Sequence, residues 1–299
     1  MSRKQTSGFM IRGGCFGMLL VWSFVSTAVW AEDFEARVPA LPGGKLSLHI
    51  SSGEVEIESH DQNEVRVDAR ARGFGPGGAN FRVVPRRGDV EVRGAAPGWL
   101  SFGSRMRVRV RVPFAYSVDV STSGGDVNVE QLRGSVRVKS SGSRIEIGQI
   151  EGDIDLDTSG GEIQAQEIFG EVKVRTSGGS IKLSEIRGEV DARTSGGSIE
   201  VDGVAGGVNA RTSGGSIAVR FVADVAGRIE TSGGNIQIRV PGRTNIDLDA
   251  VASGGGIEIE RELRPQGRRK NGRFRGKLGR GGESLALRTS GGSIYIKPD

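Results

Sequence analysis

The sequence predicts an all-β protein, a single-chain parallel β-solenoid with about 18 residues in each coil. The first observation is a tetrapeptide, Thr-Ser-Gly-Gly, which occurs seven times. It begins at Thr122, Thr158, Thr176, Thr194, Thr212, Thr231 and Thr289, and the four starts from Thr158 to Thr212 are 18 residues apart. A short fixed period means that each repeat is one supersecondary unit, which buries its apolar face only by stacking on its neighbours.

The second observation is the alternation of apolar and polar residues inside each repeat. In the repeat 158–175, Ile163 and Ala165 alternate with polar residues, and Val172 and Val174 do so after a second glycine corner. This period of two indicates two short strands in each coil. Glycine suits the corners because it adopts backbone angles that a Cβ atom disfavours. Two strands and two corners leave no room for a helix.

The third observation is that equivalent positions of successive repeats are aliphatic. One column contains only Val and Ile: Val127, Ile145, Ile163, Ile181, Ile199, Ile217, Ile236, Ile257 and Ile294. Stacked at ~4.8 Å per coil, such columns form ladders inside the tube, with backbone hydrogen bonds between coils. We expect a right-handed coil, because parallel crossovers strongly prefer that hand.

Residues 1–31 have the pattern of a signal peptide. Three basic residues precede an uncharged apolar run at 13–31, and Val29 and Ala31 stand at the −3 and −1 positions of a cleavage site before Glu32. The alternative is an uncleaved anchor, because 19 uncharged residues approach the ~20 that span a bilayer. The sequence therefore predicts an exported protein that is periplasmic, on the cell surface or secreted.

Cysteine and charge exclude several functions. Cys15 is the only cysteine and lies in the predicted leader, so the mature chain has no disulfide, thiol nucleophile or cysteine-bound metal. Without the leader the chain keeps 38 of its 41 basic residues, against 36 acidic ones. This balance does not favour a nucleic-acid partner. We expect no cofactor.

The mature chain, residues 32–299, reads as one solenoid domain with two loop-rich interruptions. Residues 34–72 alternate like solenoid strands, and the motif at 50–53 lies 72 residues, or four periods, before Thr122. The first interruption, near 73–105, contains two clusters of Gly and Pro.

The regular stack then runs from Ser117 to about Val222, with a one-residue insertion before Thr231. The second interruption, near 261–282, is rich in Gly and Arg. It falls inside a spacing of 37 residues between two motifs, or roughly two coils.

Several segments resemble a bacterial family of β-strand-repeat proteins classed provisionally as adhesins of unknown function. They are VDVSTSGGDV at 118–127, SSGEVEI at 51–57, LRTSGGSI at 287–294 and the TSGGSI units between them. The similarity covers nearly all of the mature chain. The resemblance implies the solenoid fold, and because the family has no shared catalytic set, it implies no enzymatic activity.

The position before each repeated threonine should lie outside the tube, so Arg175, Arg193 and Arg211 should stack one coil apart. Such like charges repel by ~1 kcal/mol or less when hydrated. One interpretation is a solvated face that suppresses aggregation. The other is a stripe that binds phosphate or carboxylate groups of an envelope polymer, since arginine binds both in bidentate fashion.

The segment 261–282 holds nine basic residues and one acidic residue, Glu262. Arg268, Arg269 and Lys270 at its centre form a second candidate anion site, for a membrane surface or an anionic glycan. A mobile, solvated loop is the alternative interpretation.

The aspartates of 153–157 have the spacing of a calcium loop, but ladder residues separate them. We therefore predict no metal site, and expect Asp155 to pair with Arg137 and Lys173 on neighbouring coils.

These features favour an exported, non-enzymatic, adhesin-like or structural protein of the cell envelope that acts by multivalent contact. Its partner would be an anionic envelope polysaccharide or lipid, or an envelope protein. One alternative is a periplasmic scaffold or envelope-stress component that binds a protein through a solenoid end, where Ile294–Ile296 would be an unpaired strand edge.

A polysaccharide-active β-helix enzyme is disfavoured, because His49 and His60 have no metal or triad spacing and the acidic residues scatter along exposed faces.

Overall fold

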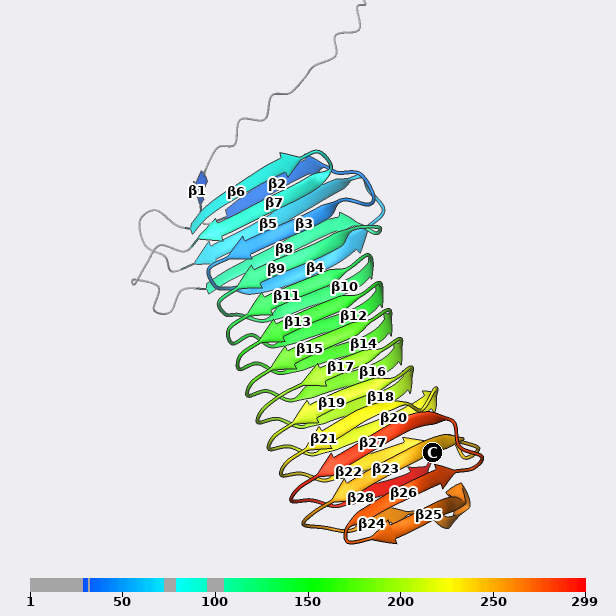
Figure 1. Cartoon of the computed structure of the whole chain (residues 1–299). Coiled ribbons are helices and arrows are strands. Elements are labelled where there is room, and N and C mark those ends of the chain that lie inside the picture. The colour runs from blue at the N-terminus through cyan, green and yellow to red at the C-terminus, as the bar shows by residue number, and fades with distance from the viewer. Residues whose placement is uncertain (1–28, 32, 73–78, 96–104) are drawn as a thin grey trace, which may run out of the picture.

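The protein is a long rod built from two sheets that form opposite sides of a flattened tube (Figure 1). The computed structural model describes residues 29–31, 33–72, 79–95 and 105–299. Most neighbouring strands run parallel, and each regular coil contributes one strand to each sheet. The predicted all-β parallel solenoid is confirmed, and its hand stays a prediction.

Sheet A has 15 strands. In spatial order these are β1 (Val29–Ala31), β6 (Ala79–Arg86), β7 (Asp89–Ala95), β3 (Lys45–Ile50), β9 (Ser117–Thr122), β11 (Val136–Ser140), β13 (Ile154–Thr158), β15 (Val172–Thr176), β17 (Val190–Arg193), β19 (Val208–Thr212), β21 (Gly227–Thr231), β27 (Glu283–Thr289), β23 (Ile246–Ala252), β26 (Arg273–Leu278) and β25 (Pro265–Lys270).

Sheet B has 13 strands. In spatial order these are β2 (Asp33–Pro39), β5 (Glu64–Arg72), β8 (Arg105–Pro113), β4 (Glu54–His60), β10 (Val127–Arg133), β12 (Ile145–Glu151), β14 (Ile163–Phe169), β16 (Ile181–Arg187), β18 (Ile199–Ala205), β20 (Ile217–Ala223), β22 (Ile236–Val240), β28 (Ile294–Pro298) and β24 (Ile257–Ile259). A 3-10 turn, η1 (Arg261–Leu263), precedes β25.

The aliphatic columns form the core between the sheets, as predicted. Ile163 pairs in register with Ile181 and Ile181 with Ile199, and all three are buried. The repeated threonines point inward as well. Thr194 Oγ1 donates a hydrogen bond to the carbonyl oxygen of Gly179 on the preceding coil, at 2.9 Å. The equivalent hydroxyls from Thr158 to Thr289 also bond to the neighbouring coil, whereas Thr122 bonds to Gly124 within its own corner.

The N-terminal end of the rod differs from the prediction. Strands β3 and β4 pair directly with β9 and β10, so Ile50 lies beside Thr122 rather than four coils away. The residues between β4 and β9 in the sequence, which contain β5 to β8, do not form coils between these strands but fold back toward the N-terminal end of the rod. Strand β8 runs antiparallel to β5, and β7 antiparallel to β6, which makes an antiparallel cap. Part of the interruption expected at 73–105 is therefore a hairpin, and 73–78 and 96–104 lie outside the described residues.

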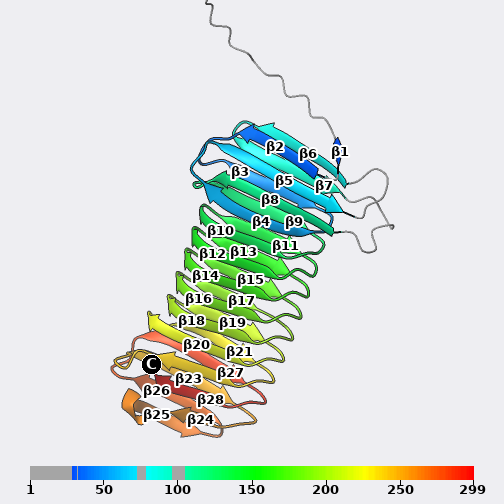
Figure 2. The same ribbon diagram turned by 180° about the vertical axis from the view of Figure 1, so that it is seen from behind.

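The C-terminal end also departs from sequential stacking (Figures 1 and 2). Strand β27 inserts between β21 and β23, and β28 between β22 and β24. The expectation of an unpaired edge at Ile294–Ile296 is therefore wrong, because this strand has a partner on each side. The segment 261–282 is a hairpin of β25 and β26 that continues sheet A.

Most of the predicted leader, residues 1–28, and Glu32 after the expected cleavage site lie outside the described residues. The three residues before that site form β1, which pairs antiparallel with β6. A membrane-spanning helix is absent from the part of the chain that the structure describes.

Candidate anion-binding site

Three arginines line up on the outer face of sheet A, as predicted. Strands β15, β17 and β19 carry them, and the register places Arg175 beside Arg193 and Arg193 beside Arg211. Their side chains are 40%, 56% and 73% exposed. The residues on either side of Arg175 in its strand, Val174 and Thr176, face the core. We call Arg175, Arg193 and Arg211 the arginine ladder.

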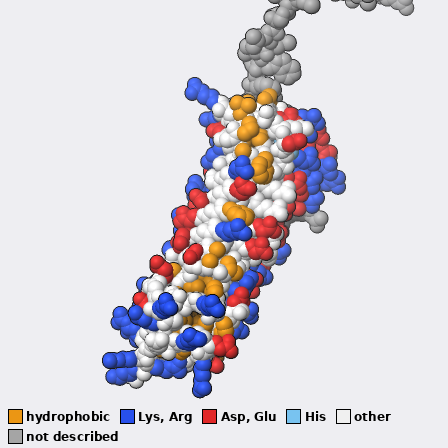
Figure 3. Space-filling model, turned by 90° about the vertical axis from the view of Figure 1, so that its right-hand side faces the viewer, with side chains coloured by type: hydrophobic (Ala, Val, Ile, Leu, Met, Phe, Trp, Pro, Cys, Tyr) orange, Lys and Arg blue, Asp and Glu red, His pale blue; other side chains and the backbone are white. Residues whose placement is uncertain are grey.

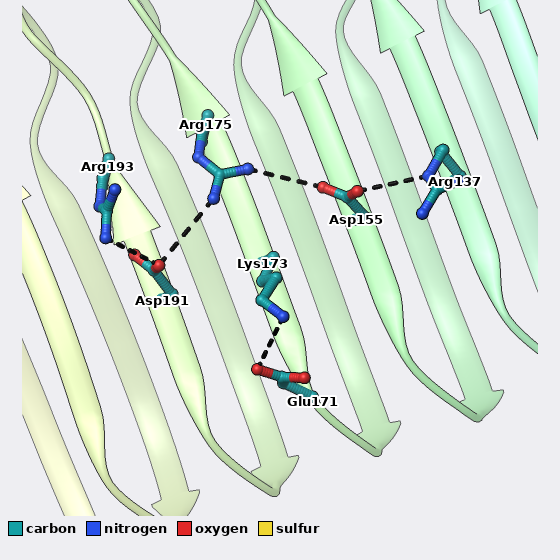
Figure 4. Close-up of polar contacts among 7 residues, drawn as sticks. All are labelled: Arg137, Asp155, Glu171, Lys173, Arg175, Asp191 and Arg193. Carbon is teal, nitrogen blue, oxygen red and sulfur yellow. Dashed lines mark hydrogen bonds and ion pairs between the residues drawn. The ribbon is translucent and has the colours of Figure 1, made fainter.

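The adjacent outward row on the same strands has a different pattern. Its charge alternates from coil to coil through Asp119, Arg137, Asp155, Lys173 and Asp191. Nε of Arg137 lies 3.3 Å from Oδ2 of Asp155, which confirms the predicted pair. Lys173 is in register with Asp155, but its ammonium group binds Glu171 at 2.9 Å (Figure 4). That hydrogen bond raises the pKa of Lys173 above its ordinary value. Alternation of this kind stabilises a sheet, and the arginine ladder in the neighbouring row lacks it.

Carboxylates nevertheless contact the ladder from the side (Figure 4). Oδ2 of Asp191 lies 2.9 Å from Nη2 of Arg193 and 4.0 Å from Nη2 of Arg175. Nη1 of Arg175 lies 3.7 Å from Asp155, and Nη1 of Arg211 lies 3.5 Å from Glu230. Most of these distances are too long for strong hydrogen bonds. The carboxylates therefore orient the guanidinium groups but leave N–H donors available to a ligand.

Sequence reasoning missed the role of Asp191. This residue belongs to the adjacent row, and the contact with Arg175 runs diagonally between strands, which a comparison of columns does not display. Its other oxygen, Oδ1, is buried without a hydrogen-bond partner among the described residues. Asp191 therefore orients two arginines through Oδ2 alone. Exposed ion pairs contribute about 0–1 kcal/mol, so an incoming anion can replace them.

The second predicted group lies elsewhere on the rod. Arg268, Arg269 and Lys270 are on β25, the edge strand of sheet A, five strands beyond β19. All three are exposed. The two predicted groups therefore do not form one site. In Figure 3, basic side chains gather at this end of the rod.

Other features of the described surface are shallow and open. The outer face of sheet B has a hollow of about 370 Å³ above the small residue Gly148, lined by amide and carboxylate side chains that include Gln164, Gln166 and Glu146. No group of three or more potential metal ligands occurs among residues 29–31, 33–72, 79–95 and 105–299. The outer faces of the two sheets therefore offer charged and hydrogen-bonding side chains for contact with a ligand along the rod.

Several solved structures of bacterial proteins match this chain at low identity. A provisionally named cell adhesion protein of Clostridium sporogenes is 12% identical, with 89% of this chain and 100% of that chain covered and a TM-score of 0.24. A provisionally named lipid-binding protein of Parabacteroides distasonis is 11% identical, with coverage of 90% and 97% and a TM-score of 0.44. A provisionally named adhesin of Bacteroides fragilis is 11% identical, with coverage of 89% and 97% and a TM-score of 0.38.

None of the curated proteins compared with this chain matches it. A family model described as Toastrack DUF4097 matches residues 44–297, from the residue before β3 to the penultimate residue of β28. This match confirms the family resemblance drawn from the Thr-Ser-Gly-Gly motifs. The chain belongs to the Toastrack DUF4097 family.

Proposed function

We propose that this chain is an exported, non-enzymatic, adhesin-like protein of the cell envelope that binds anionic polysaccharide along one side of its rod. The observation that carries the proposal is the arginine ladder. Charge alternates from coil to coil in the adjacent row, yet Arg175, Arg193 and Arg211 follow one another directly. Like charges side by side cost stability, and proteins break such local rules mainly where function requires it.

The chemistry of the ladder fits a polymer with repeated anionic groups. A guanidinium group binds a carboxylate or phosphate through two parallel N–H bonds. At ~4.8 Å per strand, three arginines span about 10 Å of the rod. One polymer chain can therefore contact several of them at once. Each contact is weak, but together they gain affinity through effective concentration.

The alternatives have less support. The scaffold hypothesis relied on an unpaired terminal strand, and β28 is paired on both sides. A protein partner would have to use another edge, such as β24 or β2. For the enzyme hypothesis, the carboxylates beside the ladder are held by basic neighbours on an open face, which does not provide the enclosed acid and base that glycan cleavage requires.

Charge reversal of the ladder should abolish salt-sensitive binding of the chain to an anionic glycan. The probe is immobilised polygalacturonate, and the variant combines Arg175→Glu, Arg193→Glu and Arg211→Glu. We expect at least about tenfold weaker binding at low salt, because three exposed contacts of about 0.5 kcal/mol each together amount to a tenfold change in Kd.

The matched control changes the same charge elsewhere, with Arg144→Glu, Arg239→Glu and Arg243→Glu. These arginines are exposed and lie outside the strands of sheet A. Circular dichroism should show that both variants keep their β structure. Equal loss of binding in the two variants would mean that net charge, and not the ladder, attracts the glycan.

A further inference from the structure

The C-terminal hairpin carries many basic side chains and few ion pairs among the described residues. Strands β25 and β26 extend sheet A at the end of the rod. The hairpin is firmly attached, because Leu263, Phe274 and Leu278 are buried against the core. Five of the six residues of β25 are exposed. It is therefore an ordered platform and not the loop that its composition suggested.

Basic side chains of the hairpin lie directly opposite one another. The register pairs Arg268 with Arg275 and Lys270 with Arg273 on one face of the hairpin. Arg269 points to the opposite face, because successive residues of a strand alternate. Like charges at cross-strand positions destabilise a sheet. The hairpin nevertheless keeps them.

Strand β8, at the other end of the rod, provides a comparison for the basic side chains of the hairpin. Strand β8 also presents a row of outward arginines. There Arg107, Arg109 and Arg111 each have a glutamate on β4 as an ion-pair partner, at 2.8, 2.8 and 3.8 Å. Arg107, Arg109 and Arg111 are thus each compensated by a glutamate of the neighbouring strand β4.

The hairpin has no equivalent set of carboxylates. Within the described residues, only Arg273 of the nine basic side chains at 261–282 forms an ion pair. Its partner is Asp249, at 2.9 Å from Nε and 2.7 Å from Nη2. That contact raises the pKa of Arg273 and attaches β26 to β23. The remaining cations keep their charge available for an external anion.

We propose that the C-terminal hairpin docks the end of the rod on an anionic phospholipid surface, with its arginines bound to lipid phosphates. Its cations occupy two strands, both faces of the hairpin and the turn before it. Figure 3 shows Lys and Arg side chains projecting on more than one side of this end of the rod. A single polymer chain follows one line, whereas a lipid surface offers phosphates over an area. The charge of such a surface attracts clustered Lys and Arg. This docking is independent of the polysaccharide contact proposed for the ladder.

Vesicle sedimentation tests this docking on the chain 32–299. The vesicles are pure phosphatidylcholine, or phosphatidylcholine with about one-third phosphatidylglycerol, whose phosphate carries an uncompensated negative charge. We expect binding only to the anionic vesicles, and less of it at high salt. Combining Arg268→Gln, Arg269→Gln and Lys270→Gln should weaken this binding about tenfold or more. These residues are exposed on an edge strand, so the fold should persist. Arg275→Gln with Lys277→Gln on β26 should act in the same direction.

The control removes three exposed arginines at the opposite end of the rod, Arg70, Arg82 and Arg87, also as glutamines. Its vesicle binding should stay within about twofold of the unaltered chain. Equal losses in the hairpin and control variants would overturn the proposal. So would a chain that ignores anionic vesicles but binds polygalacturonate or polyphosphate through the hairpin, since the hairpin would then be a polymer site. Binding of the ladder variant to vesicles separates the two proposals, because that variant should dock normally.

Discussion

Removal of residues 283–299 should unfold the C-terminal end of the rod while the regular coils stay folded. These residues form β27 and β28, which lie between the coil of β21 and β22 and the coil of β23 and β24. They bury five side chains: Leu285, Leu287, Thr289, Ile294 and Ile296. Each fully buried aliphatic side chain contributes about 1.5–3 kcal/mol. The strands beyond them would also lose their parallel partners.

Hydrogen exchange measures this effect residue by residue. In the truncated chain, amides of 246–278 should exchange almost freely, and those of 117–222 should stay protected. A chain that stops after Ile296 keeps the five buried residues and serves as the control. Added peptide 283–299 should restore protection by refilling the gap. Protection of 246–278 in the truncated chain without peptide would contradict the account, because it would mean that β23 and β24 stack directly on β21 and β22.

Gly197→Ala should destabilise the protein by about 3 kcal/mol, through overpacking and loss of a hydrogen bond. A Cβ atom at Gly197 would lie 2.0 Å from the carbonyl oxygen of Gly179 on the preceding coil. That oxygen also accepts the hydrogen bond of Thr194. Neither group can move easily, because the corner is bonded to the coils on both sides. The second glycine of the tetrapeptide is therefore required by the close approach of two backbones.

The neighbouring Gly196 is a matched control. A Cβ atom there would come no closer than 3.5 Å to Gly178, which is an ordinary contact. Gly196→Ala should therefore change the free energy of unfolding by less than about 0.5 kcal/mol. Guanidinium unfolding of the two variants compares them directly. Similar destabilisation by both would show that glycine is needed here for its flexibility and not for space.

The regular coils could be predicted because their constraints repeat every 18 residues. The alternation of apolar and polar residues along each strand distinguishes inward from outward side chains. It therefore predicted that Ile181 faces the core and that Arg193 faces outward. The order of coils could not be predicted in the same way. The coil that contains Thr289 has the same kind of inward aliphatic residues as its neighbours. Its sequence therefore does not indicate which coils it stacks between. Periodicity determines what a coil contains and leaves open which coils are adjacent.

The candidate site was predictable to a similar extent. The in-register arginines followed from the column before each threonine. The hairpin did not, because β25 has no apolar alternation and reads as a polar loop; only Phe274 and Leu278 on β26 indicate a buried face. The contrast between compensated arginines on β8 and uncompensated ones on β25 depends on which strands are neighbours. Such pairings between distant segments appear only in the fold.

The most direct test of the central claim is the salt dependence of binding to polygalacturonate by the chain 32–299 and its ladder variants. Arginines 175, 193 and 211 are replaced by glutamine one, two and three at a time. If the ladder binds the polymer at several points, the slope of log Kd against log salt concentration should fall by roughly one for each arginine removed. The same slope in all four proteins would contradict multivalent anion binding by the ladder.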